Sequence, residues 1–174
     1  MAYTAADASQ KVTLVLDPPE DLLTVTAADL NAGLDIHNDI LKTDFQATAT
    51  DSTTHNDTPL GSKGQWPNFA GRNANASVTV LRDLDETGRP DAESSSETTF
   101  AAVREPGTRV GLFVRKGPDP DEDWQDDDEV RWGGVVQTDV PREPSDPNDG
   151  FIKVVVPLGV QDFETYFNVA AVGV

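Results

Sequence analysis

Histidine and carboxylate side chains are the groups of this chain that could take part in acid–base chemistry. The two histidines, His37 and His55, have no G-x-S-x-G partner motif, and the chain contains no cysteine. Carboxylate pairs suited to glycoside hydrolysis carry little information here, because a chain with 31 acidic residues always offers some pair at a suitable spacing. We therefore predict no catalytic residues and expect that the protein is not an enzyme.

Metal and cofactor sites are also not expected. Asp119, Asp121 and Asp123 begin like a calcium-binding EF-hand loop, but the sixth position is Trp124, where a sharp turn needs glycine, and the twelfth is a valine, where a bidentate Glu belongs. A looser site for hydrated cations is the alternative to a solvated acidic loop. Gly61-Ser-Lys-Gly64 is too short for a phosphate-binding P-loop, so we predict no metal and no cofactor.

The charge of the chain limits its partners. Its 174 residues carry 31 acidic and 13 basic side chains, a formal net charge of −18. Phosphates need Lys and Arg opposite them, so free binding to nucleic acid and to anionic membranes is disfavoured. Two compatible interpretations remain: a protein that lies near DNA without binding it, or a protein adapted to molar salt, where self-repulsion is screened. We expect neither a signal peptide nor a membrane-spanning segment.

Apolar, β-branched segments between Pro- and Gly-rich turns predict a mainly β fold. Two patterns predict capped helices: Thr26 with Asp29 opens a short helix that Gly33 closes, and Ser94 with Glu97 opens the main helix, residues 94–105. The predicted strands are residues 11–16, 44–50, 77–82, 109–116, 130–140, 151–158 and 162–172.

This order of elements favours a single domain over residues 1–174, with two packed antiparallel sheets, as a sandwich or an open barrel, flanked by one main helix. Phe100 and Val103 lie at helical spacing and are expected to pack that helix onto a sheet. Two long loops are predicted, a polar one at residues 51–76 and an acidic one at residues 117–129.

The long polar loop contains three large apolar residues, Leu60, Trp66 and Phe69. Aromatic anchors in a solvated segment are typical of partner-binding sites, and local packing is the alternative for Trp66 and for Trp124 in the acidic loop. Trp132 lies in a predicted strand and is expected in the core.

Three blocks of the sequence resemble the major tail tube proteins of long-tailed, siphovirus-like phages or of haloarchaeal tailed viruses. They are residues 22–36, which contain Thr-Ala-Ala-Asp-Leu-Asn-Ala-Gly; residues 94–116 (SSSETTFAAVREPGTRVGLFVRK); and residues 150–160 (GFIKVVVPLGV) followed by 163–172. The resemblance rests on the order of these blocks and on the kinds of residues they contain, and together they cover about a third of the chain.

The resemblance implies two packed sheets flanked by a helix, and subunits that form hexameric rings whose sheets join into one barrel. Stacked rings would make a hollow conduit for genome ejection, through which DNA passes without specific binding. The implied partners are further copies of the chain and the terminator, tape measure and distal tail proteins. The implied location is the virion tail, and the host cytoplasm during assembly.

A tube subunit needs contacts around the ring and between rings. Sheet joining can supply the first, so we assign ring stacking to residues 51–76 through Leu60, Trp66 and Phe69, and the solvent side to residues 117–129. The alternatives are another small virion protein, such as a tail terminator, head–tail connector or capsid decoration protein, or a monomeric β-sandwich binding module of a halophile.

The charge predicts that the thermal unfolding midpoint rises with salt, because screening relieves self-repulsion. Melts at about 0.1 M and about 2 M sodium chloride test this, with several salts compared to separate screening from preferential salt exclusion. A midpoint that stays constant or falls would contradict adaptation to high salt.

Overall fold

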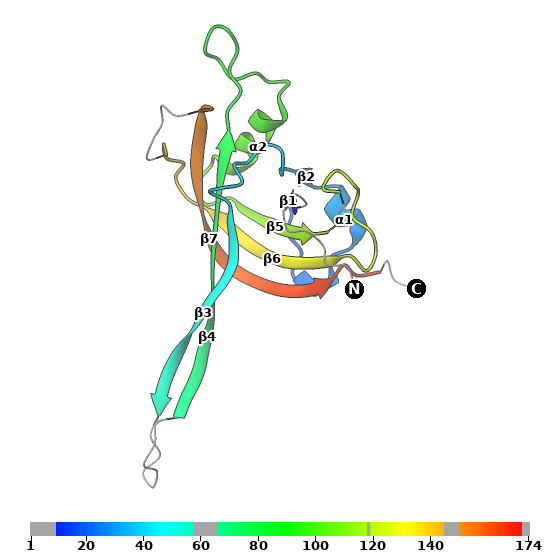
Figure 1. Cartoon of the computed structure of the whole chain (residues 1–174), viewed down its shortest axis with the longest axis vertical. Coiled ribbons are helices and arrows are strands. Elements are labelled where there is room, and N and C mark those ends of the chain that lie inside the picture. Colours follow the sequence, from blue (N-terminus) through cyan, green and yellow to red (C-terminus); the bar gives the residue numbers. More distant parts are fainter. Residues whose placement is uncertain (1–9, 58–65, 118, 145–149, 172–174) are drawn as a thin grey trace, which may run out of the picture.

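The computed structural model describes residues 10–57, 66–117, 119–144 and 150–171, and its strands form one seven-stranded antiparallel sheet (Figure 1). The strand order is β2-β1-β5-β6-β7-β4-β3. The strands are β1 (Gln10–Val15), β2 (Leu34–Asp35), β3 (Gln46–Asp57), β4 (Trp66–Leu81), β5 (Arg109–Lys116), β6 (Glu129–Thr138) and β7 (Lys153–Asn168). The helical elements are the 3-10 helix η1 (Leu22–Thr24) and the α-helices α1 (Ala27–Asn31) and α2 (Ser95–Val103).

The expected fold class, mainly β with antiparallel pairing and one main helix, is confirmed. The strands make one continuous sheet rather than two separate ones, and this sheet is strongly curved (Figure 1). The segment between β2 and β3 crosses the concave side, where Ile40 bridges to Val80 of β4. The curved sheet therefore encloses a core in the manner of an open barrel.

Strand β5 lies at the centre of the packing, as its apolar sequence predicts, because both of its faces are buried. Val110, Leu112 and Val114 face a cluster that collects residues from β1, β3, β4, β6, β7 and α2. Phe113 faces a second cluster on the opposite side, with Leu22, Leu30 and Trp124 among its members. The sheet thus has two apolar faces, and each needs its own cover.

The first cluster includes Trp132 of β6, which is fully buried and stacks on Phe163 of β7 at 6.3 Å between ring centroids. The next residue, Gly133, lies under the rings of Phe113 and Phe167, and a Cβ there would approach the Phe167 ring to 2.8 Å. Glycine at this position lets two aromatic rings pack directly onto the strand backbone.

Helix α1 covers the second face with η1. Its predicted capping box is confirmed: Asp29 N–H donates to the Thr26 hydroxyl, and Thr26 N–H donates to the Asp29 carboxylate. The Thr26 hydroxyl also donates to that carboxylate, which lowers the pKa of Asp29. Gly33 follows the helix because a Cβ there would lie 2.6 Å from the Leu14 carbonyl oxygen.

Helix α2 packs on the first cluster through Val103, which is fully buried, and Phe100, which is half-buried. The predicted capping box at its start is wrong, because the Ser94 side chain makes no cap bond and Glu97 binds Arg82 instead. Arg82 donates to both Glu97 oxygens, at 2.7 and 2.8 Å, and its guanidinium lies 4.1 Å from the Phe100 ring centroid. Two charge-assisted bonds to a guanidinium are stronger than one bond to a backbone N–H.

Strand β7 replaces two predicted strands. Gly159 predicts a turn between these two strands, but the chain continues in one strand through Gly159, which pairs with Gln137. A register shift between Val135 and Val136 accommodates one extra β7 residue. Such a bulge bends a strand without ending it. The apolar pattern of the sequence is therefore interrupted near Gly159, while the pairing of β7 with β6 continues.

The Arg82–Glu97 pair predicts an acid-dependent stability. The hydrogen bonds from Arg82 hold the pKa of Glu97 below its ordinary value of 4.5. A carboxylate with a lowered folded-state pKa contributes stability above the unfolded value, and this contribution is lost as the pH falls through the folded value. Glu97→Gln should therefore destabilise the protein by about 3 kcal/mol at pH 7, since it disrupts a largely buried pair, and by progressively less as the pH falls below 4.5 and through the lower folded-state pKa of Glu97.

Urea unfolding at several pH values measures this difference. Glu105→Gln is the control, because Glu105 is exposed and its contact with Arg104 is a surface ion pair worth at most about 0.5 kcal/mol. A destabilisation by Glu97→Gln that does not change between pH 7 and pH 3.5 would contradict this role of the ion pair.

Candidate assembly surfaces

The segment expected to be a long loop is a β-hairpin, so that prediction is wrong for residues 51–57 and 66–76. Strand β3 continues to Asp57 and pairs with β4, which begins at Trp66. The Thr-, Asn- and Gly-rich composition led to the loop prediction because it lacks the apolar alternation of a strand with one buried face.

This hairpin projects from the body of the molecule (Figure 1). Among the described residues, β4 pairs with β7 between Ala76 and Leu81, and residues 66–75 pair with β3 alone. The described side chains at positions 53–55 and 69–73 are all exposed. A two-stranded ribbon with neither face buried is marginally stable in water, so this projection is suited to packing against another molecule.

The base of the hairpin is fixed to the body. Arg72 donates to Glu164 of β7 at 2.9 Å, and its guanidinium lies 5.1 Å from the Phe163 ring centroid. The pairing of β3 with β4 shifts register between Thr50 and Thr53, and the Asn73 amide donates to Asp51 O there. Bulges increase local twist, and the direction of the hairpin is thus set at its base.

The residues predicted for ring stacking fall on this hairpin or between its strands. Phe69 lies on β4 opposite Thr54 and is 74% exposed. The backbone of Trp66 pairs with Asp57, while its side chain and all of Leu60 lie outside the described parts of the chain. His55 is exposed on β3.

The two edges of the sheet differ. Among the described residues, β3 has no strand paired along its outer side, and this edge is 12 residues long. At the other edge, β2 covers β1 at two positions, Thr13 and Leu14. Unpaired edges present rows of backbone donors and acceptors that can pair with another chain.

Most carboxylates of the acidic loop are exposed, whereas its tryptophan anchors the loop to the body. Trp124 is 1% exposed and lies in the second cluster, so it packs locally rather than serving as an exposed anchor for a partner. Its indole N–H donates to the Thr13 hydroxyl at 2.9 Å. Asn31 of α1 binds both the N–H and the carbonyl of Trp124. The loop is therefore part of the cover on the second face.

Two buried basic residues hold this region together. The Arg115 guanidinium donates to the carbonyls of Asp119, Glu122 and Asp123 and to the Asp128 carboxylate. Lys11, 1% exposed, binds Asp35 and the Pro120 carbonyl. The sequence pattern did not indicate either role, although each residue is a base within a strand of mostly apolar residues.

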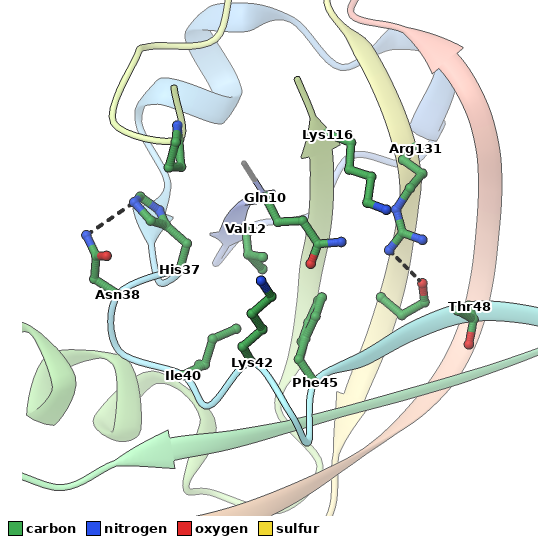
Figure 2. A pocket seen from close by; sticks show the side chains of 12 residues that line it. Gln10, Val12, His37, Asn38, Ile40, Lys42, Phe45, Thr48, Lys116 and Arg131 are labelled. Atoms are coloured by element: carbon green, nitrogen blue, oxygen red, sulfur yellow. Dashed lines mark hydrogen bonds between the residues drawn. The ribbon is translucent and has the colours of Figure 1, made fainter. Parts of the chain in front are cut away.

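A pocket of about 470 Å³ opens beside this region and was also not foreseen. It lies between the start of β1, the β2–β3 connection, the end of β5 and the start of β6. Figure 2 shows the side chains of Lys42, Lys116 and Arg131 extending toward the space around Gln10. His37 lines the pocket as well, and its Nε2 lies 3.1 Å from Asp121.

Exposed apolar side chains also occur on the body. They include Phe151 and Ile152, which precede β7, and Val140, which follows β6. The start of β7 lies at the opposite end of the long axis from the hairpin (Figure 1). Large exposed apolar residues at two ends of one molecule are suited to contacts between copies in a row.

Within the described residues, no three His, Asp or Glu side chains are grouped so as to hold a metal ion. No helix among these residues has the length and apolar character needed to cross a membrane.

Comparison with known proteins adds one finding. A family described as phage tail tube protein matches residues 1–173. No curated protein matches the chain.

The anchoring of the acidic loop gives a stability prediction. Trp124→Ala should destabilise the protein by about 3–5 kcal/mol, because it removes a buried indole and leaves a cavity. Gln125→Ala is the control, since Gln125 is exposed in the same loop, and should change stability by less than about 0.5 kcal/mol. Urea unfolding measures both, and a loss below about 1 kcal/mol for Trp124→Ala would show that the loop does not depend on this residue.

Proposed function

The chain belongs to the family of phage tail tube proteins and is a structural subunit of the virion tail, and from this premise we propose how its copies assemble. The β3–β4 hairpin of each subunit contacts a subunit of the next ring, and the sheet edges join neighbours within a ring. The rings are hexameric and stack into a hollow conduit for genome ejection. The subunits assemble in the host cytoplasm.

The projecting hairpin carries this proposal. Its strands expose both faces along residues 53–55 and 69–73, and Phe69 presents an aromatic ring to solvent. Burial of such a ring against a neighbour stabilises an interface, because aromatic anchors dominate interface energetics. The exposed Phe151 and Ile152, at the other end of the long axis, are suitable acceptors in the next copy.

The edges of the sheet support the lateral contact. The outer edge of β3 and the short β2 cover on β1 leave backbone groups available at both ends of the strand order. Pairing the β3 edge of one subunit with the β1–β2 edge of the next is a head-to-tail contact, which closes into a ring when the rotation allows. Closure would remove the exposed edges that invite aggregation.

The charge supports passive transport of DNA. A wall with net charge −18 per subunit repels phosphates, so the genome would pass without being held. The terminator, tape measure and distal tail proteins are the proposed neighbours at the ends and inside of the tube.

Shortening the hairpin tests the axial contact. Because residues 66–73 pair with β3, both strands must be shortened together, and replacing residues 54–70 with Asn-Gly keeps the pairing at the base. This variant should remain folded and form rings or small oligomers without growing into tubes. Negative-stain microscopy and sedimentation of the purified full chain and the variant measure this.

A point substitution separates the aromatic anchor from the hairpin itself. Phe69→Ser should raise the protein concentration needed for tube growth roughly tenfold or more, whereas Thr54→Ser, at the paired position, should leave it unchanged. Tubes of normal length from the shortened variant would contradict the assignment of ring stacking to the hairpin.

A further inference from the structure

We infer that the pocket beside β1 binds carboxylates of a second copy of the chain, supplied by its β4–α2 connection, residues 83–93. This inference rests on the proposed self-assembly and names one contact within it. The pocket is lined by Lys42, Lys116 and Arg131, three of the 13 Lys and Arg residues of the chain. Among the described residues that line it there is no Asp or Glu, in a chain that contains 31.

The pocket also holds buried polar atoms that lack partners within the described structure. His37 has a side chain that is 9% exposed, and its Nδ1 makes no hydrogen bond there. Arg131 donates from Nη2 to the Ala47 carbonyl at 3.4 Å, while its buried Nε makes no hydrogen bond. The Arg131 Nε–H is therefore an unpaired buried donor, which is costly, so a ligand that accepts hydrogen bonds from it is favoured.

The chemistry of these groups selects a carboxylate. A guanidinium with a free Nε–H can donate in the fork geometry that matches a carboxylate, and two lysine ammonium groups add positive charge at the rim. Lys116 and Lys42 are exposed at that rim. The nearby Asp121 is directed to His37 Nε2, so one carboxylate already borders the site without lining it.

A second copy is the occupant that fits the charge. Copies with a net charge of −18 repel one another, so a stable contact between them needs a place where acidic side chains meet basic ones. The acidic loop of the second copy is a poor match, because its carboxylates flank the same pocket and would meet their own equivalents. Residues 83–93 carry exposed acids away from that loop: Asp83, Asp85, Glu86, Asp91 and Glu93.

The location of this connection also favours propagation. It lies at the end of the molecule where α2 lies, opposite the hairpin (Figure 1). A contact between two different surfaces of identical chains is heterologous, and such contacts build rings or filaments. Glu86 and Glu93 sit on exposed turns of this connection, so their carboxylates can reach a neighbour.

Charge exchange in the full-length chain tests the inference. Lys116→Glu should raise the concentration needed for tube growth roughly tenfold, as expected for loss of one partly desolvated charge pair. Combining it with Glu86→Lys or Glu93→Lys should restore growth to within about threefold of the unmodified chain. Arg109→Glu is the matched control, because it makes the same charge change at the exposed other end of β5.

A competition experiment separates the ligand sources. A synthetic peptide of residues 83–93 should inhibit tube growth of the unmodified chain, while inorganic phosphate at the same concentration and ionic strength should not. Equal inhibition by phosphate would show a general anion site and overturn the assignment to this segment.

The outcomes distinguish this inference from the proposed function. If the unmodified chain forms no tubes, the proposed assembly fails. If it forms tubes and Lys116→Glu forms them equally well, the assembly stands and the pocket contact is overturned. Inhibition of growth by Arg109→Glu to the same extent as by Lys116→Glu would also overturn it, because the effect would then follow net charge alone.

Discussion

The central sheet is apolar on both of its faces, and this one constraint organises the rest of the molecule. The sheet curves so that the residues of one face pack against each other, and α2 and the β2–β3 connection cover the rest of that face. The other face is covered by η1, α1 and Trp124 of the acidic loop. Residues 53–55 and 69–73 of the hairpin are exposed, and no other described element covers them. This difference separates the surfaces that stabilise the subunit from those available for assembly.

The basic side chains follow the same division. In a chain with 31 acidic and 13 basic residues, several of the bases are used where a carboxylate or a carbonyl must be held. Arg115 and Lys11 organise the acidic loop, Arg82 fixes α2 through Glu97, and Arg72 fixes the base of the hairpin to β7. Lys42, Lys116 and Arg131 line one pocket, where they gather positive charge in an otherwise acidic chain.

The sequence predicted the elements that bury apolar side chains at a regular period. It also predicted the central strand at residues 109–116, which is apolar on both faces, and the capping box at Thr26, because each depends on local chemistry. It failed at the hairpin, whose polar strands have no buried face to produce alternation, and at Glu97, whose partner Arg82 is 15 residues away. The pocket was missed for a related reason, since its residues come from four separate segments that only the fold brings together.

The central claim is that the hairpin packs on a neighbouring subunit, and electron cryomicroscopy of tubes grown from the purified chain tests it most directly. We expect a map in which residues 50–57 and 66–73 contact a subunit of the adjacent ring, with Phe69 buried at that contact. A map in which the hairpin stays in solvent, or packs only on its own subunit, would contradict the account.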